Sequence, residues 1–203
     1  MVLDSRIFDL PQFQLAALKK TLAPAEVDAL KARHKEQWEQ WKALARRLAA
    51  TLALPAPYVE SWTNGWQLRA HFFATLKTAA GADSASIISL LWNRRRLTVS
   101  LDWHAYRADR SRSTLADYNR WLDALGPEFA DWEIWPGTAD EYADYPTLAT
   151  APPPVIDADH PFYCLGRHRP RAALAQPDLE DWLAASVRAL LPLYTASLGP
   201  SSP

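Results

Sequence analysis

Apolar residues recur every three or four positions along the first quarter of the chain, which predicts two helices. The first is expected from Pro11 to Leu22, because proline suits a first helical turn and the leucines share one face. The second is expected from Pro24 to about Leu54, where Pro55 follows and stops it. Its apolar face consists of Val27, Leu30, His34, Trp38, Trp41, Ala45, Leu48 and Leu52. Charged residues flank this face, which indicates a long helix lying on an apolar surface.

The apolar period changes to two after these prolines, which predicts strands. Apolar and polar residues alternate from Trp66 to Leu76, as in one strand with one wet face. Asn64-Gly65 is a strong turn signal, so we expect a short partner strand from Tyr58 to Trp62. Two further runs, Ile88 to Trp92 and Leu97 to Trp103, predict a hairpin.

Burial selects the register of this hairpin. Pairing Trp92 with Leu97 places the apolar residues of both strands on one face. The opposite face then carries Thr98, Ser100, Asp102 and His104.

The second half of the chain predicts two more helices and two short strands. In order, we expect a helix at Thr114 to Leu125, a strand at Trp132 to Trp135, an irregular excursion at Pro136 to Pro154, a strand at Phe162 to Gly166 and a helix at Pro177 to Leu193. The fold class is therefore α+β, an antiparallel β-sheet with a meander of at least three strands, packed by amphipathic helices. We expect one domain over residues 1–198 and a disordered tail at 199–203.

Composition restricts location and partners more than chemistry. The 203 residues are 49% hydrophobic and carry a formal net charge of -1, so no global field draws the protein to nucleic acid or membrane. The lone cysteine, Cys164, forms no intramolecular disulfide and is expected as a buried structural thiol. No apolar run reaches the roughly 18 residues of a membrane span and no signal peptide opens the chain, so we expect a cytoplasmic protein without membrane contact.

Several kinds of site lack sequence support. The six glycines are too scattered for a dinucleotide-binding turn or a P-loop. No cysteine pair, His-Glu-x-x-His motif or calcium-loop spacing occurs, and the nucleophile-elbow motif is missing. We therefore expect no metal and no cofactor.

The polar face of the sheet is the first candidate site. Arg69 and His71 on one predicted strand, and Asp102 and His104 on another, project the same way if the strands share a sheet. Convergent titratable groups on a rigid platform suit catalysis or recognition. The alternative is a solvated face on which Asp102 and Arg69 form a weak surface salt bridge.

The arginine-rich hairpin tip is the second candidate. Arg94, Arg95 and Arg96 form this tip, and guanidinium groups bind phosphate in bidentate fashion. Two further basic groups would extend the surface if they converge with it, namely Arg107, Arg110 and Arg112, and Arg167, His168, Arg169 and Arg171. Charge that merely keeps an exposed loop soluble is the alternative.

Aromatic and acidic residues supply the remaining candidates. Five tryptophans fall on predicted buried faces and are expected in the core, namely Trp38, Trp41, Trp66, Trp92 and Trp103. Another group lies in irregular or edge segments, where it either packs or stacks on a ligand, namely Trp62, Trp132, Trp135, Tyr142 and Tyr145. The acidic strip of Asp140, Glu141 and Asp144 either folds onto the basic tip or lies in solvent.

Several short segments together resemble a known family. They are Trp62 to Trp66, Leu101-Asp102-Trp103-His104, Tyr118-Asn119-Arg120-Trp121-Leu122, Ile134-Trp135-Pro136, Asp140-Glu141-Tyr142 and Leu191-Pro192-Leu193-Tyr194. From about residue 58 to 194 the chain resembles a poorly characterised bacterial family whose members carry either a glucose-6-phosphate 1-dehydrogenase or a DNA-binding label. The dehydrogenase label conflicts with the absence of a pyrophosphate-binding turn. The DNA-binding label agrees with the arginine clusters.

Three hypotheses for function follow. The first is a non-enzymatic module in which Arg94, Arg95 and Arg96 contact nucleic-acid backbone, with Arg69 and Arg107 extending the patch. The second is an enzyme for a small or nucleotide substrate, with His71 or His104 as general base and Asp102 as its orienting partner. The third is a protein-interaction module, which requires a large exposed apolar patch.

Overall fold

A computed structural model describes residues 3–135, 142–153, 155–157 and 164–200, and at Cys164 it describes the backbone alone. A six-stranded sheet lies at its centre, with the strand order β1-β4-β5-β6-β8-β7 and antiparallel pairing throughout. Its strands are β1 (Tyr58–Val59), β4 (His71–Leu76), β5 (Ser86–Asn93), β6 (Arg96–Trp103), β7 (Glu133–Trp135) and β8 (Cys164–Pro170). With the helices described next, this confirms the predicted α+β class.

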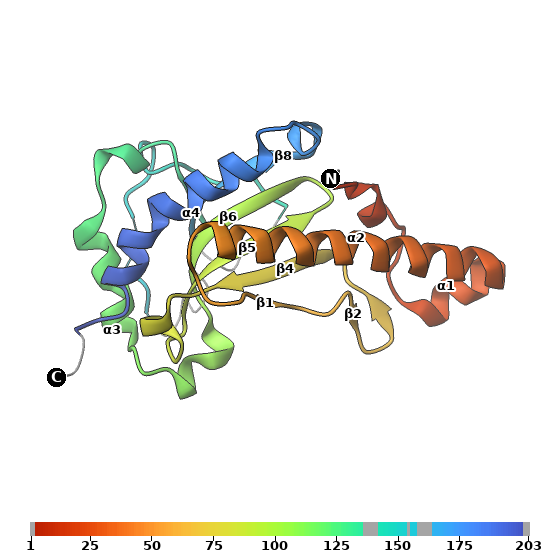
Figure 1. Cartoon of the computed structure of the whole chain (residues 1–203), viewed down its shortest axis with the longest axis horizontal. Helices are drawn as coiled ribbons and strands as arrows, with labels where there is room; N and C mark the ends of the chain where they lie inside the picture. Colours follow the sequence, from red (N-terminus) through yellow and green to blue (C-terminus); the bar gives the residue numbers. More distant parts are fainter. Residues whose placement is uncertain (1–2, 136–141, 154, 158–163, 201–203) are drawn as a thin grey trace.

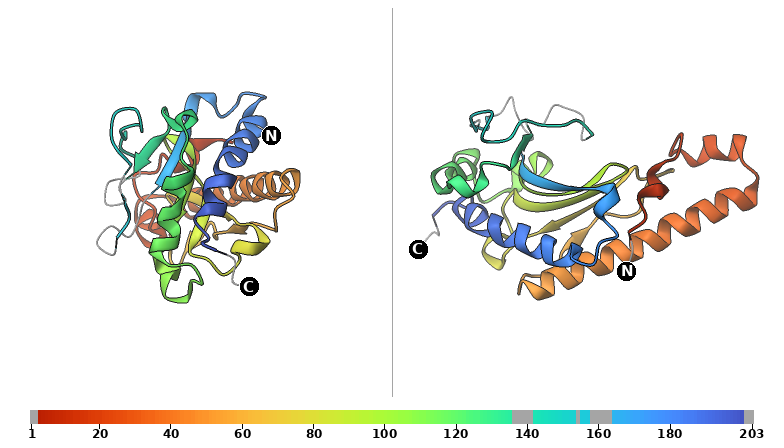
Figure 2. Two further views of the ribbon diagram at one scale, coloured as in Figure 1. Left: turned by 90° about the vertical axis from the view of Figure 1, so that its left-hand side faces the viewer. Right: turned by 90° about the horizontal axis from the view of Figure 1, so that it is seen from above.

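Two long helices, α2 (Pro24–Thr51) and α4 (Leu179–Ala196), cover one face of the sheet (Figures 1 and 2). The start of α2 is the predicted one, because the Glu26 side chain accepts a hydrogen bond from the Ala23 N–H at 2.8 Å and so caps the first turn. The helix buries His34 among other residues of its predicted apolar face. The sheet is thus apolar on the side of these helices.

The hairpin of β5 and β6 has the predicted register. Trp92 pairs with Leu97, and the strands continue antiparallel to the pair of Ser86 and Trp103. All of the residues assigned to its inner face are buried, namely Ile88, Leu90, Trp92, Leu97, Val99, Leu101 and Trp103. These side chains form the centre of the core with α2 and α4.

A smaller lobe extends beyond the sheet along the first half of α2 (Figure 1). It contains α1 (Leu15–Thr21) and the hairpin of β2 (Thr63–Asn64) and β3 (Gln67–Leu68). Its own apolar cluster includes Leu18 from α1 and Leu68 from β3.

The predicted continuous strand from Trp66 to Leu76 is wrong in its first part. Gly65 has a φ of 56°, so the chain turns between β2 and β3, and Trp66 lies in that turn with 88% of its surface exposed. The alternation of residues through the turn imitated that of a strand. Trp66 is therefore not a core residue.

Other boundaries shift for local reasons. The first helix begins at Leu15, four residues after the predicted start. The helix predicted at Thr114 to Leu125 is one α-helical turn, capped by Thr114, which continues as a 3-10 helix. Of the excursion predicted from Pro136 to Pro154, residues 136–141 and 154 lie outside the described part, as do residues 162 and 163 of the last predicted strand.

Within the part of the chain that the structure describes, seven short helical segments connect these elements. They are η1 (Ser5–Phe8), η2 (Ala79–Gly81), η3 (Ala105–Arg110), α3 (Leu115–Tyr118), η4 (Asn119–Ala124), η5 (Pro127–Phe129) and η6 (Arg171–Ala173). Across the described ranges, no helix is both long enough and apolar enough to cross a membrane.

Candidate functional site

The second face of the sheet carries polar side chains that alternate with the core residues. The register aligns Ser89 with Ser100, Ser100 with Gly166, and Gly166 with Glu133. Figure 2 shows residues 142–153 and 155–157 on this side of the curved sheet, opposite the two long helices. Ser89 and Ser100 are buried, so this face differs from the alternative of a simply solvated surface.

Two adjoining cavities of about 50 Å³ and 370 Å³ lie on this face. Because both are lined by Phe73, Leu91, Asp102 and Trp135, we name the combined surface the sheet-face groove. The smaller cavity is also lined by Ser89, Arg96, Thr98, Ser100, Glu133, Tyr145 and Gly166. The larger is also lined by Glu60, Arg69, His71, Ile87, Trp103, His104 and Tyr106.

A hydrogen-bonded network crosses the floor of the groove. The Ser89 hydroxyl donates a short hydrogen bond to Asp102 Oδ2, and its oxygen lies 2.9 Å from Ser100 Oγ. Two buried hydroxyls therefore support one carboxylate that borders both cavities. Such a carboxylate is oriented for recognition, because its rotamer is held by its neighbours.

Gly166 leaves room for this network. A Cβ atom at Gly166 would lie 2.7 Å from the Ser100 Cβ and 2.7 Å from the Val99 carbonyl oxygen. A side chain at this position would therefore push into the floor of the smaller cavity.

Arg96 lies inside one end of the groove, with only 5% of its surface exposed. Its Nη2 donates a hydrogen bond of 2.6 Å to the Ala143 carbonyl, and its Nη1 lies 3.8 Å from both Glu133 and Asp144. Its guanidinium also lies 5.6 Å from the centre of the Tyr145 ring. This arginine joins the sheet to residues 143–145.

Arg94 and Arg95 stand at the hairpin tip outside the groove. Arg94 lies 4.6 Å from the centre of the Tyr142 ring, and Arg95 donates a hydrogen bond of 3.0 Å to Asp144. Asp144 of the predicted acidic strip therefore contacts the basic tip. The other two residues of that strip, Asp140 and Glu141, lie outside the described residues.

Glu133 and the aromatic residues beside it form the far wall. Glu133 Oε1 lies 2.8 Å from His168 Nδ1, so the carboxylate stands between an imidazole and the guanidinium of Arg96. The rings of Trp135 and Tyr145 stack with their centres 5.8 Å apart. The groove therefore combines carboxylates with flat apolar surfaces.

Four of the predicted site residues, Arg69, His71, Asp102 and His104, line the larger cavity of the groove. Arg69 is paired with Glu60 at 2.8 Å. His71 and Asp102 lie at opposite ends of the cavity, because His71 pairs with Asn93 and Asp102 with Ile87, about 20 Å apart along β5. This separation prevents a direct His71–Asp102 pair.

His104 is the histidine near Asp102, two residues further along the chain. Burial lowers its pKa, and the positive charges of Arg107 and Lys77 lower that pKa further. His104 is therefore neutral near pH 7. Arg107 faces a separate cavity beyond Tyr106 and lies 5.4 Å from the centre of the Tyr58 ring.

The basic group on β8 and η6 has structural partners. Arg169 forms two hydrogen bonds with Asp178, and Arg171 forms two with Asp9. Arg167 donates to Ser186 on α4. These residues attach neighbouring elements to the sheet, so this cluster does not extend the hairpin tip as an open basic surface.

Sequence reasoning missed part of the groove. Glu133 and Ser89 were not identified, although Ser89 lies between the inward-facing Ile88 and Leu90 and its outward position follows from alternation. Trp135 and Tyr145 were identified as aromatic residues but not assigned to this face. Their approach depends on the β7–β8 pairing and on residues 142–145, which leave no local signal.

The protein-interaction hypothesis, which requires a large exposed apolar patch, meets little support in the described residues. Within the same ranges, no group of three or more His, Cys, Asp and Glu side chains could hold a metal ion. Large exposed hydrophobic residues there are scattered over separate segments, namely Tyr58, Trp66, Tyr106 and Val155. Single exposed apolar residues are normal for a protein surface.

Comparisons with known proteins show to which family the chain belongs. A protein-family model matches residues 3–197. A protein of Haemophilus influenzae (strain ATCC 51907 / DSM 11121 / KW20 / Rd) with the name "Uncharacterized protein" is 42% identical over 193 residues, which are 93% of each chain. No solved structure matches the chain. Neither match carries a dehydrogenase or DNA-binding label. The chain belongs to the protein family whose model matches residues 3–197.

Proposed function

We propose that the sheet-face groove binds a small molecule rich in hydroxyl or amine groups. The observation that carries this proposal is the position of Asp102, a carboxylate supported by Ser89 and bordering both cavities. Ligand sites are typically concave and mostly apolar, with a few polar groups that fix orientation. The groove has this composition.

The charges in the groove favour a ligand with hydrogen-bond donors. Arg69 is already paired with Glu60, and Arg96 contacts the Ala143 carbonyl and stands near Glu133. Asp102 accepts a hydrogen bond from the Ser89 hydroxyl, and its carboxylate borders both cavities of the groove. Carboxylates accept hydrogen bonds strongly, and charged hydrogen bonds contribute more to binding than neutral ones.

The aromatic walls favour a ligand with a flat or apolar side. Trp135 on β7 and Phe73 on β4 both border the two cavities. Packing against aromatic rings contributes area and orientation at once. A sugar, cyclic polyol or nucleoside combines such a side with hydroxyl groups.

The test is a thermal-shift screen of sugars, polyols and nucleosides, followed by calorimetric titration of the compounds that stabilise the protein. Asp102→Asn keeps the shape of the side chain and removes its charge, so we expect affinity to fall about tenfold or more. Asp123→Asn is the matched control, because Asp123 is an exposed residue on η4. Equal loss in both variants, or none in either, would contradict the proposal.

Enzymatic turnover of that ligand is a second candidate, supported by His104. This imidazole lines the same cavity as Asp102 and its pKa is lowered, so it is present as the neutral base that proton abstraction requires. Conversion of a bound ligand should be followed by mass spectrometry and should be lost in His104→Gln. If the ligand binds but is not converted, the turnover hypothesis is wrong and the protein acts on this ligand by binding alone.

Nucleic-acid binding by the hairpin tip is a third candidate, supported by the exposure of Arg94 and Arg95. The contacts of these residues with Tyr142 and Asp144 are surface interactions, which are weak enough to exchange for phosphate. Fluorescence anisotropy with labelled DNA at two salt concentrations tests it. Binding should weaken with salt and in the Arg94→Ala, Arg95→Ala, Arg96→Ala triple variant.

A further inference from the structure

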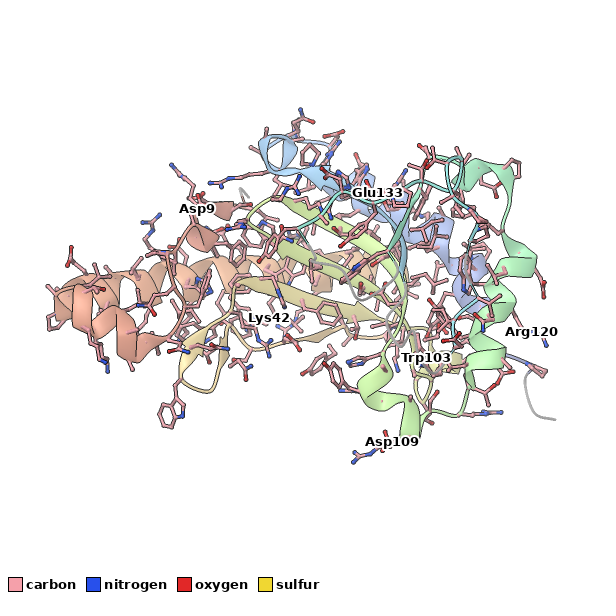
Figure 3. All side chains as sticks on the ribbon, turned by 180° about the vertical axis from the view of Figure 1, so that it is seen from behind. Asp9, Lys42, Trp103, Asp109, Arg120 and Glu133 are labelled. Carbon is pink, nitrogen blue, oxygen red and sulfur yellow. The ribbon has the colours of Figure 1, made fainter. Side chains whose placement is uncertain are left out.

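A further cavity adjoins the sheet-face groove at Tyr106. It has a volume of about 460 Å³ and lies between the end of β4 and the η3 segment that follows β6. Tyr106, which is 81% exposed, borders both cavities. In Figure 3, Asp109 marks this region, well separated from Glu133 at the other end of the sheet face.

Among the described residues, two of the three cations that line this cavity, Lys77 and Arg107, have no carboxylate partner. Lys77 donates hydrogen bonds to the carbonyl oxygens of Ala82 and Ser84, which are neutral. Arg107 lies against the ring of Tyr58. Within the described part of the chain, neither residue has an Asp or Glu oxygen within 4.0 Å.

The positive charge is concentrated enough to act on neighbouring groups. Desolvation lowers the pKa of Lys77, and Arg107 lowers it further. Arg107 and Lys77 also oppose protonation of His104. A doubly charged anion placed between Lys77 and Arg107 would relieve this repulsion.

Acidic residues do not cancel these two cations. Asp109 and Asp83 line the same cavity, but Asp109 lies 3.7 Å from the exposed Arg110. Of the two carboxylates, Asp83 is thus left to balance the positive charges of both Lys77 and Arg107. The cavity keeps an excess of positive charge, unlike the sheet-face groove.

We propose that Lys77 and Arg107 form a subsite for the phosphate group of a ligand whose hydroxyl-bearing part occupies the sheet-face groove. This inference rests on the proposed function and names its ligand class, a phosphorylated sugar or nucleoside. Guanidinium and ammonium groups are the usual protein partners of phosphate. Tyr106 stands where such a ligand passes from one cavity to the other, and its exposed ring offers a stacking surface.

The experiment is calorimetric titration of the full-length protein with two matched pairs of compounds, ribose 5-phosphate with ribose, and adenosine 5′-monophosphate with adenosine. Inorganic phosphate is titrated separately. The variants are Arg107→Gln, which removes the charge, and Arg107→Lys, which keeps it. Arg188→Gln, on the exposed side of α4, is the matched control for loss of one arginine.

We expect at least one phosphorylated compound to bind about tenfold or more tightly than its unphosphorylated partner. Arg107→Gln should abolish this difference, Arg107→Lys should retain part of it, and Arg188→Gln should leave it unchanged. Thermal unfolding of each variant confirms that it is folded.

The other outcomes separate this inference from the proposed function. Equal affinity within each pair, with loss in Asp102→Asn, would overturn the phosphate subsite and leave the groove proposal standing. If inorganic phosphate binds in an Arg107-dependent way but no sugar or nucleoside binds, the proposal that one ligand occupies both the subsite and the groove would be overturned. A phosphate preference that survives Arg107→Gln would also overturn the subsite, as would no binding of any phosphate compound.

Discussion

At the scale of single residues, His34 illustrates a polar group that the fold tolerates in one protonation state. The side chain is 1% exposed and its ring lies within 5.8 Å of the ring centres of Phe8 and Phe72. Burial lowers the pKa of His34 from 6.5 to about 4. The histidine therefore fits this aromatic surrounding as a neutral ring.

We expect His34 to make the protein sensitive to acid. The unfolded chain binds a proton at His34 below pH 6.5, whereas the folded protein does so only near pH 4. The contribution of neutral His34 to the free energy of unfolding is complete above pH 6.5 and is lost as the pH falls toward 4. At pH 5 the free energy of unfolding should be lower by about 2 kcal/mol for this reason. Urea unfolding at pH 7 and pH 5 measures this difference.

His34→Leu is the comparison, because leucine has a similar volume and does not titrate. The carboxylates are common to both proteins, so the difference between their pH dependences isolates the histidine. An identical loss of stability between pH 7 and pH 5 in both proteins would contradict the assignment.

Gly166 supplies a second test at this scale. Gly166→Ala places a Cβ against the Val99 carbonyl and the Ser100 side chain. The Val99 carbonyl belongs to the backbone and cannot move away easily. We expect the free energy of unfolding to fall by about 1–3 kcal/mol. Chemical denaturation measures it, and an unchanged midpoint would show that the floor of the groove is more adaptable than its geometry suggests.

At the scale of elements, the β5–β6 hairpin separates two kinds of arginine. The Asn93 side chain accepts hydrogen bonds from the backbone N–H groups of Arg95 and Arg96, at 2.8 Å and 3.0 Å, and so shapes the turn. Arg96 then lies inside the groove and Arg95 at the surface. Two adjacent arginines thus have different roles.

Arg96→Leu and Arg95→Leu form a matched pair for this distinction. Loss of Arg96 removes the cation beside Glu133 and the bond to Ala143, so we expect a destabilisation of about 2 kcal/mol or more. Loss of Arg95 removes an exposed pair and should cost less than about 1 kcal/mol. Hydrogen exchange of residues 142–146 should rise strongly only in Arg96→Leu. Equal exchange in both variants would place the anchor of this segment elsewhere.

At the scale of the whole molecule, the parts that the sequence predicts are those whose signal is local. Helix α2 and the register of β5 and β6 follow from periodicity, because each buries one continuous face. The exposed position of Trp66 does not, because alternation continues unchanged through the turn at Gly65.

The site was predictable only in part for a related reason. Alternation identifies Asp102 and His104 as residues of the polar face, but the same pattern occurs in a solvated face and in a covered one. The cover depends on the placement of β8 between β6 and β7, and on contacts between Arg96 and residues 143–145. These are pairings between distant segments, which no short window of sequence records.

The central claim is that Asp102 in the sheet-face groove binds the donor groups of a small molecule. The most direct measurement is the thermal-shift screen of sugars, polyols, nucleosides and their phosphates against the unmodified protein, Asp102→Asn and Asp123→Asn. We predict that at least one compound raises the Tm of the unmodified protein and of Asp123→Asn but not that of Asp102→Asn. A panel in which no compound raises the Tm, or in which Asp102→Asn responds like the unmodified protein, would contradict the account.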